Sequence, residues 1–216
     1  MPSKANILLI YTGGTIGMVK DFETGVLKAF NFSKLLKSIP ELKLLDCSIE
    51  TVSFEIPIDS SNMNIEEWKK IAILIKDNYD NYDGFVVLHG SDTMSYSASA
   101  LSFMLENLNK PVVFTGSQLP IGDLRTDAKE NLITAIQVAS LKNKNKSIIN
   151  EVCLYFEYKL YRGNRTTKIS AEHFSAFASP NFPALAESGV HLNVNENILL
   201  KKVTAKKLQV NTTLDD

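Results

Sequence analysis

The sequence predicts an α/β fold in which helices cover a mostly parallel β-sheet. Two observations lead to this prediction. Between residues 85 and 156, short β-branched runs alternate with stretches of helical hydrophobic period, which is typical of β-α-β units. Of the 216 residues, 44% are hydrophobic and 22% are charged, so the chain can bury the core that such a sheet needs.

The predicted elements follow one another at short intervals. The apolar run at residues 7–10 predicts the first strand. A helix is predicted at residues 65–79, because Asn64 and Glu67 form a capping-box-like pair at its start and apolar side chains, including Trp68 as a core residue, recur on one face. The other predicted elements are strands at 85–88, 112–114 and 152–156 and helices at 91–106 and 127–139.

Two segments lack this alternation. Residues 12–30 form a polar connection without a clear pattern, and connections of such length usually carry a function or move. After His191 the alternation of strands and helices stops. We therefore expect an α/β domain at residues 1–192, followed at residues 193–216 by a tail or linker that leads to a further domain.

Charge and cysteine content limit the possible partners. Twenty-three basic residues face 24 acidic ones, so the charge balance favours neither a nucleic acid nor an anionic membrane. No apolar run reaches the roughly 18 residues that a membrane span needs. Cys47 and Cys153 lie far apart in strand-like runs and are expected to be reduced thiols of a cytoplasmic protein. The expected ligand is a small molecule.

Glycine-rich polar segments follow three predicted strands. These segments are residues 11–17 (Tyr-Thr-Gly-Gly-Thr-Ile-Gly), 89–94 (His-Gly-Ser-Asp-Thr-Met) and 115–120 (Thr-Gly-Ser-Gln-Leu-Pro). Glycine allows the backbone to approach a ligand closely. In open α/β sheets, ligands bind beyond the carboxyl ends of the strands. The three segments therefore predict one shared cleft.

Several common kinds of site do not fit these segments. Residues 12–17 match neither the phosphate-binding P-loop nor the dinucleotide-binding glycine pattern. His89 is the only histidine near the segments, and a structural role at the end of a buried strand suits it as well as a catalytic one. His173 and His191 lack metal-ligand spacing with each other or with the cysteines, so no metal site is predicted.

Four segments resemble, in order and spacing, the signature motifs of bacterial-type L-asparaginases, most closely the cytoplasmic type I branch. They are residues 12–17, 59–63 (Asp-Ser-Ser-Asn-Met), 89–94 and 161–168 (Tyr-Arg-Gly-Asn-Arg-Thr-Thr-Lys), and the resemblance runs from residue 5 to about residue 192. It implies a three-layer sandwich around a mixed, mostly parallel sheet, similar to Rossmann and flavodoxin folds. It also implies hydrolysis of L-asparagine, and more slowly of L-glutamine, without a cofactor or metal.

The resemblance implies roles for individual residues. Thr15 stands at the position of the nucleophile, which forms an aspartyl ester and releases ammonia. Ser91, Asp92 and Lys168 stand where the family keeps a second catalytic group. Asp92 would also bind the α-ammonium group of the substrate. The residues implied to bind the substrate α-carboxylate are Asp59, Ser60 and Ser61.

The implied chemistry suits these residue types. A neutral hydroxyl is a poor nucleophile, and a lysine in a desolvated cleft can accept its proton, so Lys168 is the candidate base. Backbone amides around Ser91 and Ser117 are expected to stabilise the oxyanion, which places Ser117 among the substrate-binding residues. Without the resemblance, Lys168 would be interpreted as a solvated lysine at a strand end and Asp92 as the N-cap of the following helix.

The chain departs from the family pattern in three ways. Ser91 replaces the usual threonine, which keeps the hydroxyl but loses the methyl group that restricts its rotamer, so a lower rate is expected. Residues 23–27 lack the usual loop tyrosine, which leaves the activation of Thr15 open. Family members also have a second domain that completes the site in a homo-oligomer, and we expect this 216-residue chain to fold but to hydrolyse asparagine poorly.

Two other functions are consistent with the sequence. The first is the asparaginase-like subunit of a tRNA-dependent amidotransferase, although the balanced charge and the start at the first strand give it no support. The second is a non-catalytic module that binds aspartate or asparagine through Asp92 and Ser60.

Overall fold

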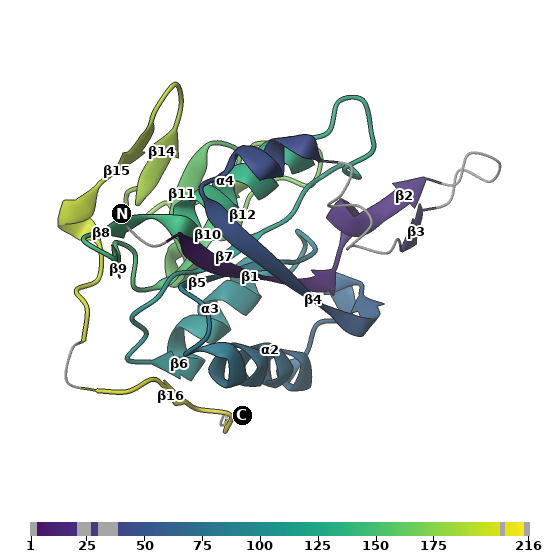
Figure 1. Cartoon of the computed structure of the whole chain (residues 1–216). Helices are drawn as coiled ribbons and strands as arrows, with labels where there is room; N and C mark the ends of the chain where they lie inside the picture. The colour runs from purple at the N-terminus through teal and green to yellow at the C-terminus, as the bar shows by residue number, and fades with distance from the viewer. Residues whose placement is uncertain (1–3, 21–26, 30–38, 204–205, 214–216) are drawn as a thin grey trace.

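A mixed β-sheet runs through the middle of the computed structural model (Figure 1), which describes residues 4–20, 27–29, 39–203 and 206–213. Two helices, α2 (Ile65–Asn78) and α3 (Met94–Met104), pack on one face of the sheet, and α4 (Ala128–Ser140) packs on the other. The predicted three-layer α/β fold is therefore confirmed.

Eight strands form the main sheet of the described residues, in the order β15-β14-β11-β10-β7-β5-β1-β4. The parallel strands are β1 (Ala5–Gly13), β4 (Cys47–Ile58), β5 (Gly84–Leu88), β7 (Val112–Thr115) and β10 (Val152–Phe156). The antiparallel strands are β11 (Lys159–Arg162), β14 (Ala186–Ser188) and β15 (Leu192–Val194). The five parallel strands place their carboxyl ends at one edge of the sheet.

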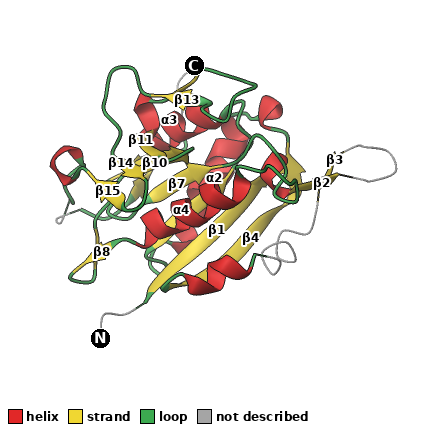
Figure 2. Ribbon diagram, turned by 90° about the horizontal axis from the view of Figure 1, so that it is seen from above, coloured by secondary structure: helices red, strands yellow, loops and turns green. Residues whose placement is uncertain are grey.

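Residues of β1 contribute alternately to the two sides of the core. Leu8 and Ile10 pack with α2 and α3, whereas Ile7 and Leu9 pack with α4 (Figure 2). All residues of β5, β7 and β10 are buried. Strands covered on both faces favour continuous apolar sequences, and this explains why these strands were predictable.

The start of α2 confirms one half of the predicted capping box. The Asn64 side chain accepts hydrogen bonds from the backbone N–H groups of Glu66 (2.9 Å) and Glu67 (3.3 Å). The Glu67 carboxylate pairs with Lys70 at 2.8 Å along the helix surface. The helix start is therefore stabilised by the cap of Asn64 and by two acidic residues in the first turn.

The connection after β1 contains more regular structure than expected. A short 3-10 turn at Thr15–Gly17 leads into β2 (Met18–Lys20), which pairs with β3 (Leu27–Ala29) in an antiparallel hairpin. The prediction of an unpatterned segment was wrong here, because strands of three residues are too short to show a period of two. Most of the stretch that lacks the family tyrosine, residues 21–26, lies outside the described residues.

Several other elements lie around the sheet. Strand β16 (Gln209–Val210) pairs with β6 (Leu105–Glu106), so part of the predicted tail contacts the same domain, while the boundary at residue 192 stays a prediction. The remaining short strands are β8 (Lys142–Asn143) with β9 (Lys146–Ser147), and β12 (Thr167–Lys168) with β13 (Phe177–Ala178). Both cysteines are free thiols, and Cys153 is buried. No described helix is long and apolar enough to cross a membrane.

We predict that Asn64→Ala lowers the free energy of unfolding by about 1 kcal/mol, because two N–H groups at the start of α2 lose their acceptor. Urea denaturation followed by circular dichroism measures this change. Asn81→Ala, at an exposed position after the same helix, is the matched control and should have a smaller effect. Equal stability losses in the two variants would contradict the role of the cap.

Candidate active site

The loops that follow β1, β4 and β5 touch one another through glycines at the carboxyl edge of the sheet. Gly14 has φ +87°, and a Cβ added there would lie 2.5 Å from the backbone nitrogen of Gly90. A Cβ added to Gly90 would lie 2.4 Å from the hydroxyl oxygen of Ser60. Side chains at these two glycines would therefore push the loops apart.

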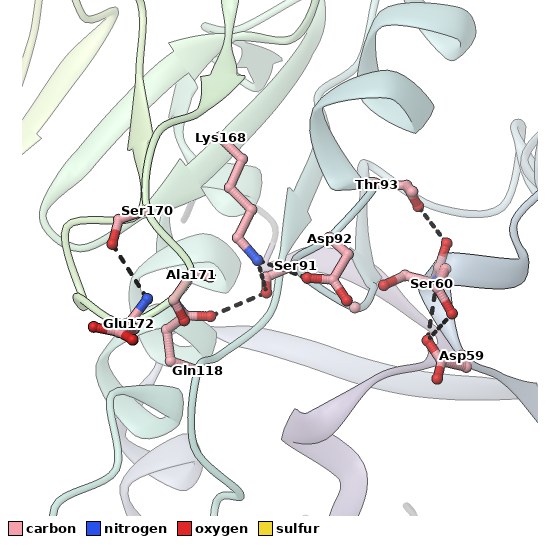
Figure 3. A network of polar contacts seen from close by, with 12 residues as sticks. Asp59, Ser60, Ser91, Asp92, Thr93, Gln118, Lys168, Ser170, Ala171 and Glu172 are labelled. Atoms are coloured by element: carbon pink, nitrogen blue, oxygen red, sulfur yellow. Dashed lines mark hydrogen bonds and ion pairs between the residues drawn. The ribbon is translucent and has the colours of Figure 1, made fainter.

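Lys168 connects to the loop after β5 by two hydrogen bonds (Figure 3). Its Nζ donates to Ser91 Oγ at 2.9 Å and to Asp92 Oδ1 at 2.7 Å. The Lys168 side chain is only 15% exposed, whereas the Asp92 side chain is 62% exposed. The structure thus brings together three of the four predicted catalytic residues, and Lys168 is not the solvated lysine of the alternative interpretation.

The N-cap interpretation of Asp92 is also wrong. Helix α3 begins at Met94, three residues later than predicted, and Thr93 occupies the N-cap position. The Thr93 hydroxyl donates to the backbone oxygen of Ser60 at 2.7 Å. Residues 91–93 therefore belong to the loop at the site, and their side chains make contacts outside the helix.

Gln118 extends the cluster to the segment after Lys168. The hydroxyl of Ser91 donates to Gln118 Oε1 at 3.0 Å, and Gln118 Nε2 donates to the backbone oxygens of Ala171 and His173, both at 3.1 Å. Sequence analysis placed Gln118 in a strand-end segment but gave it no role. Its partners are more than fifty residues further along the chain, and no local sequence signal marks them.

Ser117 faces into its own loop. Its hydroxyl donates to the backbone oxygen of Leu119 at 2.6 Å, and the side chain is buried. The backbone N–H groups of Gln118 and Leu119 donate to the carboxylate of Asp127, at 2.9 and 3.1 Å. These groups hold the loop in shape, and the structure does not bring the Ser117 hydroxyl into the hydrogen-bonded cluster around Lys168.

The turn at residues 59–61 lies next to Asp92, which Figure 3 shows between this turn and Lys168. Asp59 Oδ1 accepts from the backbone N–H of Ser61 at 3.0 Å and from its hydroxyl at 2.9 Å. Ser60 is buried against Gly90. The turn is thus fixed beside the cluster by its own hydrogen bonds and by Thr93.

Thr15 begins the 3-10 turn after β1 and is partly exposed. It directly follows Gly14, whose backbone touches Gly90 in the loop that carries Ser91 and Asp92. The predicted nucleophile is therefore located at the same sheet edge as the Lys168 cluster. Beside this cluster an open pocket of about 400 Å³ is lined by Asp92, Tyr96, Lys168 and their neighbours.

His89 has a structural role, as one of the two interpretations of the sequence expected. It is fully buried, its Nδ1 contacts the backbone oxygen of Gly90 at 2.7 Å, and its Nε2 contacts Ser97 Oγ at 2.8 Å. The indole of Trp68, which packs against the core, donates to the same Ser97 oxygen at 2.8 Å. The Ser97 hydroxyl must then donate to Nε2, which assigns the histidine proton to Nδ1. Burial lowers the pKa of His89 to about 4.

The asparaginase N-terminal family matches residues 6–200 of this chain. The chain belongs to the asparaginase family. Among the described residues, no three His, Cys, Asp or Glu side chains are grouped so that they could hold a metal ion.

Individual relatives give the same assignment. L-asparaginase 1 of Escherichia coli (strain K12) is 50% identical over 190 residues, which are 88% of this chain and 55% of that protein. The 60 kDa lysophospholipase of Mus musculus is 43% identical over 238 residues, covering 100% of this chain and 41% of that protein. A glutamyl-tRNA(Gln) amidotransferase of Methanobrevibacter smithii is less similar, at 34% identity over 100% of this chain and 50% of that protein.

A solved structure agrees with the fold. The crystal structure of L-asparaginase I from Vibrio cholerae has a TM-score of 0.86 and 44% sequence identity, and the match covers 97% of this chain and 61% of that one. The chain thus spans about half the length of the curated relatives that it matches.

We predict that acid destabilises the protein through His89. Its pKa is about 4 in the folded state against an ordinary 6.5, so between these values the unfolded chain binds a proton that the folded protein does not. This contribution to stability is complete above pH 6.5 and is lost as the pH falls towards 4, a change of about 3 kcal/mol.

Urea denaturation at several pH values tests this prediction. His89→Asn should flatten the dependence of stability on pH in this window, and His191→Gln, at an exposed position, should leave it unchanged. An unaltered pH dependence in His89→Asn would show that other groups cause the acid sensitivity.

Proposed function

We propose that the protein is an L-asparaginase, which converts L-asparagine to L-aspartate and ammonia, with L-glutamine as a slower substrate. The observation that carries the proposal is the pairing of Lys168 with Ser91 and Asp92 beside the loop of Thr15. Membership of the asparaginase family supports it. We further propose a cytoplasmic location, a homo-oligomer for the full-length protein, and a reaction that needs no cofactor.

In the proposed reaction the hydroxyl oxygen of Thr15 attacks the amide carbon of the substrate. The C–N bond breaks, and the ester that forms on Thr15 is then hydrolysed by water. Lys168, in its neutral form, accepts the hydroxyl proton directly or through Ser91, and the proton leaves on ammonia. The 2.9 Å contact between Lys168 and Ser91 provides the path for this transfer.

The proposed substrate position follows from the charges around the pocket. Asp92 pairs with Lys168 through Oδ1, and its exposed carboxylate is available to bind the α-ammonium group of the substrate. The α-carboxylate is proposed to bind at the turn of Asp59, Ser60 and Ser61, which is fixed next to Asp92. Ser117 keeps its proposed place in the substrate site through the backbone of its loop.

We predict that Thr15→Ala and Lys168→Met each lower kcat of the longest protein that the gene encodes, the lysine variant by about 10²- to 10⁴-fold, because nucleophile or base is lost. Ammonia release with L-asparagine measures the effect. Lys159→Met, which removes an exposed lysine from β11, is the matched control and should keep normal turnover. Wild-type turnover in Thr15→Ala would refute the mechanism.

We also predict that the protein binds L-aspartate, the product, and that Asp92→Asn weakens this binding because the ligand ammonium group loses its counter-charge. Isothermal titration calorimetry, run beside the ammonia assay, measures both. Aspartate binding without ammonia release would favour the non-catalytic module over the enzyme. Unchanged affinity in Asp92→Asn would contradict the proposed substrate position.

A further inference from the structure

A buried ion pair lies at the start of the segment that carries Lys168. Arg162 Nε contacts Glu151 Oε2 at 2.5 Å, and Arg162 Nη2 contacts Glu151 Oε1 at 3.3 Å. The Glu151 side chain is 3% exposed and the Arg162 side chain 13% exposed. Two contacts between planar groups fix the orientation of the guanidinium as well as its position.

The same two side chains hold the segment that follows β15. Arg162 Nη2 donates to the backbone oxygen of Ile198 at 2.7 Å, and the backbone N–H of Leu200 donates to Glu151 Oε1 at 2.8 Å. The guanidinium also lies over the ring of Phe182, 4.4 Å from its centre. Arg162 is thus held on several sides, which leaves little freedom for its backbone.

The position of Arg162 determines where the next residues lie. Arg162 ends β11 and is the N-cap of a 3-10 turn at Gly163–Arg165, and its backbone oxygen accepts from Thr166 Oγ1 at 2.8 Å. Gly163 packs directly on α3, because a Cβ added there would lie 3.0 Å from the backbone oxygen of Ala98. Helix α3 begins just after Ser91 and Asp92, so the turn is seated on the element that carries the partners of Lys168.

We propose that Glu151 and Arg162 are positioning residues for Lys168. They fix the turn at residues 163–165 on α3 and thereby set the reach of Lys168 Nζ to Ser91 and Asp92. Only five residues separate Arg162 from Lys168, so a shift at the ion pair passes to the amine with little slack. The catalytic consequence rests on the proposed function, but the positional claim concerns the amine alone.

Acylation of lysines in the intact 216-residue chain, followed by mass spectrometry, tests the positional claim. In Glu151→Gln, the charge of Arg162 loses its partner and the turn is released, so Lys168 should react severalfold faster than in the wild type. Lys142 is an internal reference, because its side chain is 13% exposed and pairs with Asp83 at 2.8 Å. Its rate should not change.

Two further variants separate positioning from loss of stability. Glu130→Gln removes a carboxylate that accepts from Tyr155 on the α4 side of the sheet, and it should leave the Lys168 rate unchanged. The double variant Glu151→Leu/Arg162→Met replaces the ion pair by apolar side chains, which generally preserves folding. It should still accelerate labelling of Lys168. An unchanged Lys168 rate in this folded variant, or an equal rise at Lys142, would overturn the proposal.

The labelling result does not depend on turnover. If Lys168 is released as expected while Lys168→Met retains full activity, the proposed function fails and the positioning claim stands. In the active protein, Glu151→Gln should lower kcat more than it changes KM, because the substrate contacts of Asp92 are kept. A change confined to KM would contradict positioning of the amine.

Discussion

Close contact between backbones at the carboxyl edge of the sheet is the constraint on which the site depends. Gly14 and Gly90 leave no room for a Cβ, and Ser60 fills the space next to Gly90. The loop of Thr15 and the loop of Asp92 can therefore approach more closely than loops with side chains at these positions. The parallel strands supply a rigid base for this contact, because they are buried on both faces.

On this base, a single amine links two parts of the chain that are distant in sequence. Desolvating the Lys168 amine costs free energy, and the hydrogen bonds to Ser91 and Asp92 offset that cost. The lysine is largely covered while Asp92 is mostly open to solvent. The cluster therefore combines a fixed, sheltered proton carrier with an accessible negative charge, which is the combination that hydrolysis of an amino-acid amide requires.

The sequence predicted the central strands well and the site only in part. The run at residues 85–88 lies within the observed β5, because a strand buried on both faces has a continuous apolar sequence. Residues 91–93 were assigned to α3, since nothing local shows that their side chains contact other loops. The roles of Gln118 and of Arg162 were not predicted, because each depends on partners distant in the chain, on both sides of Lys168.

Those two residues act on opposite ends of the same segment. Arg162 fixes the backbone before Lys168, and Gln118 holds the backbone oxygens of Ala171 and His173 after it. A lysine side chain loses up to about 2 kcal/mol of conformational entropy when it is fixed, so a mobile backbone would leave the amine distributed over many positions. Holding both ends of the segment confines Lys168 Nζ within hydrogen-bonding distance of Ser91. The reactive geometry therefore requires both anchors, and not only the residues that contact the substrate.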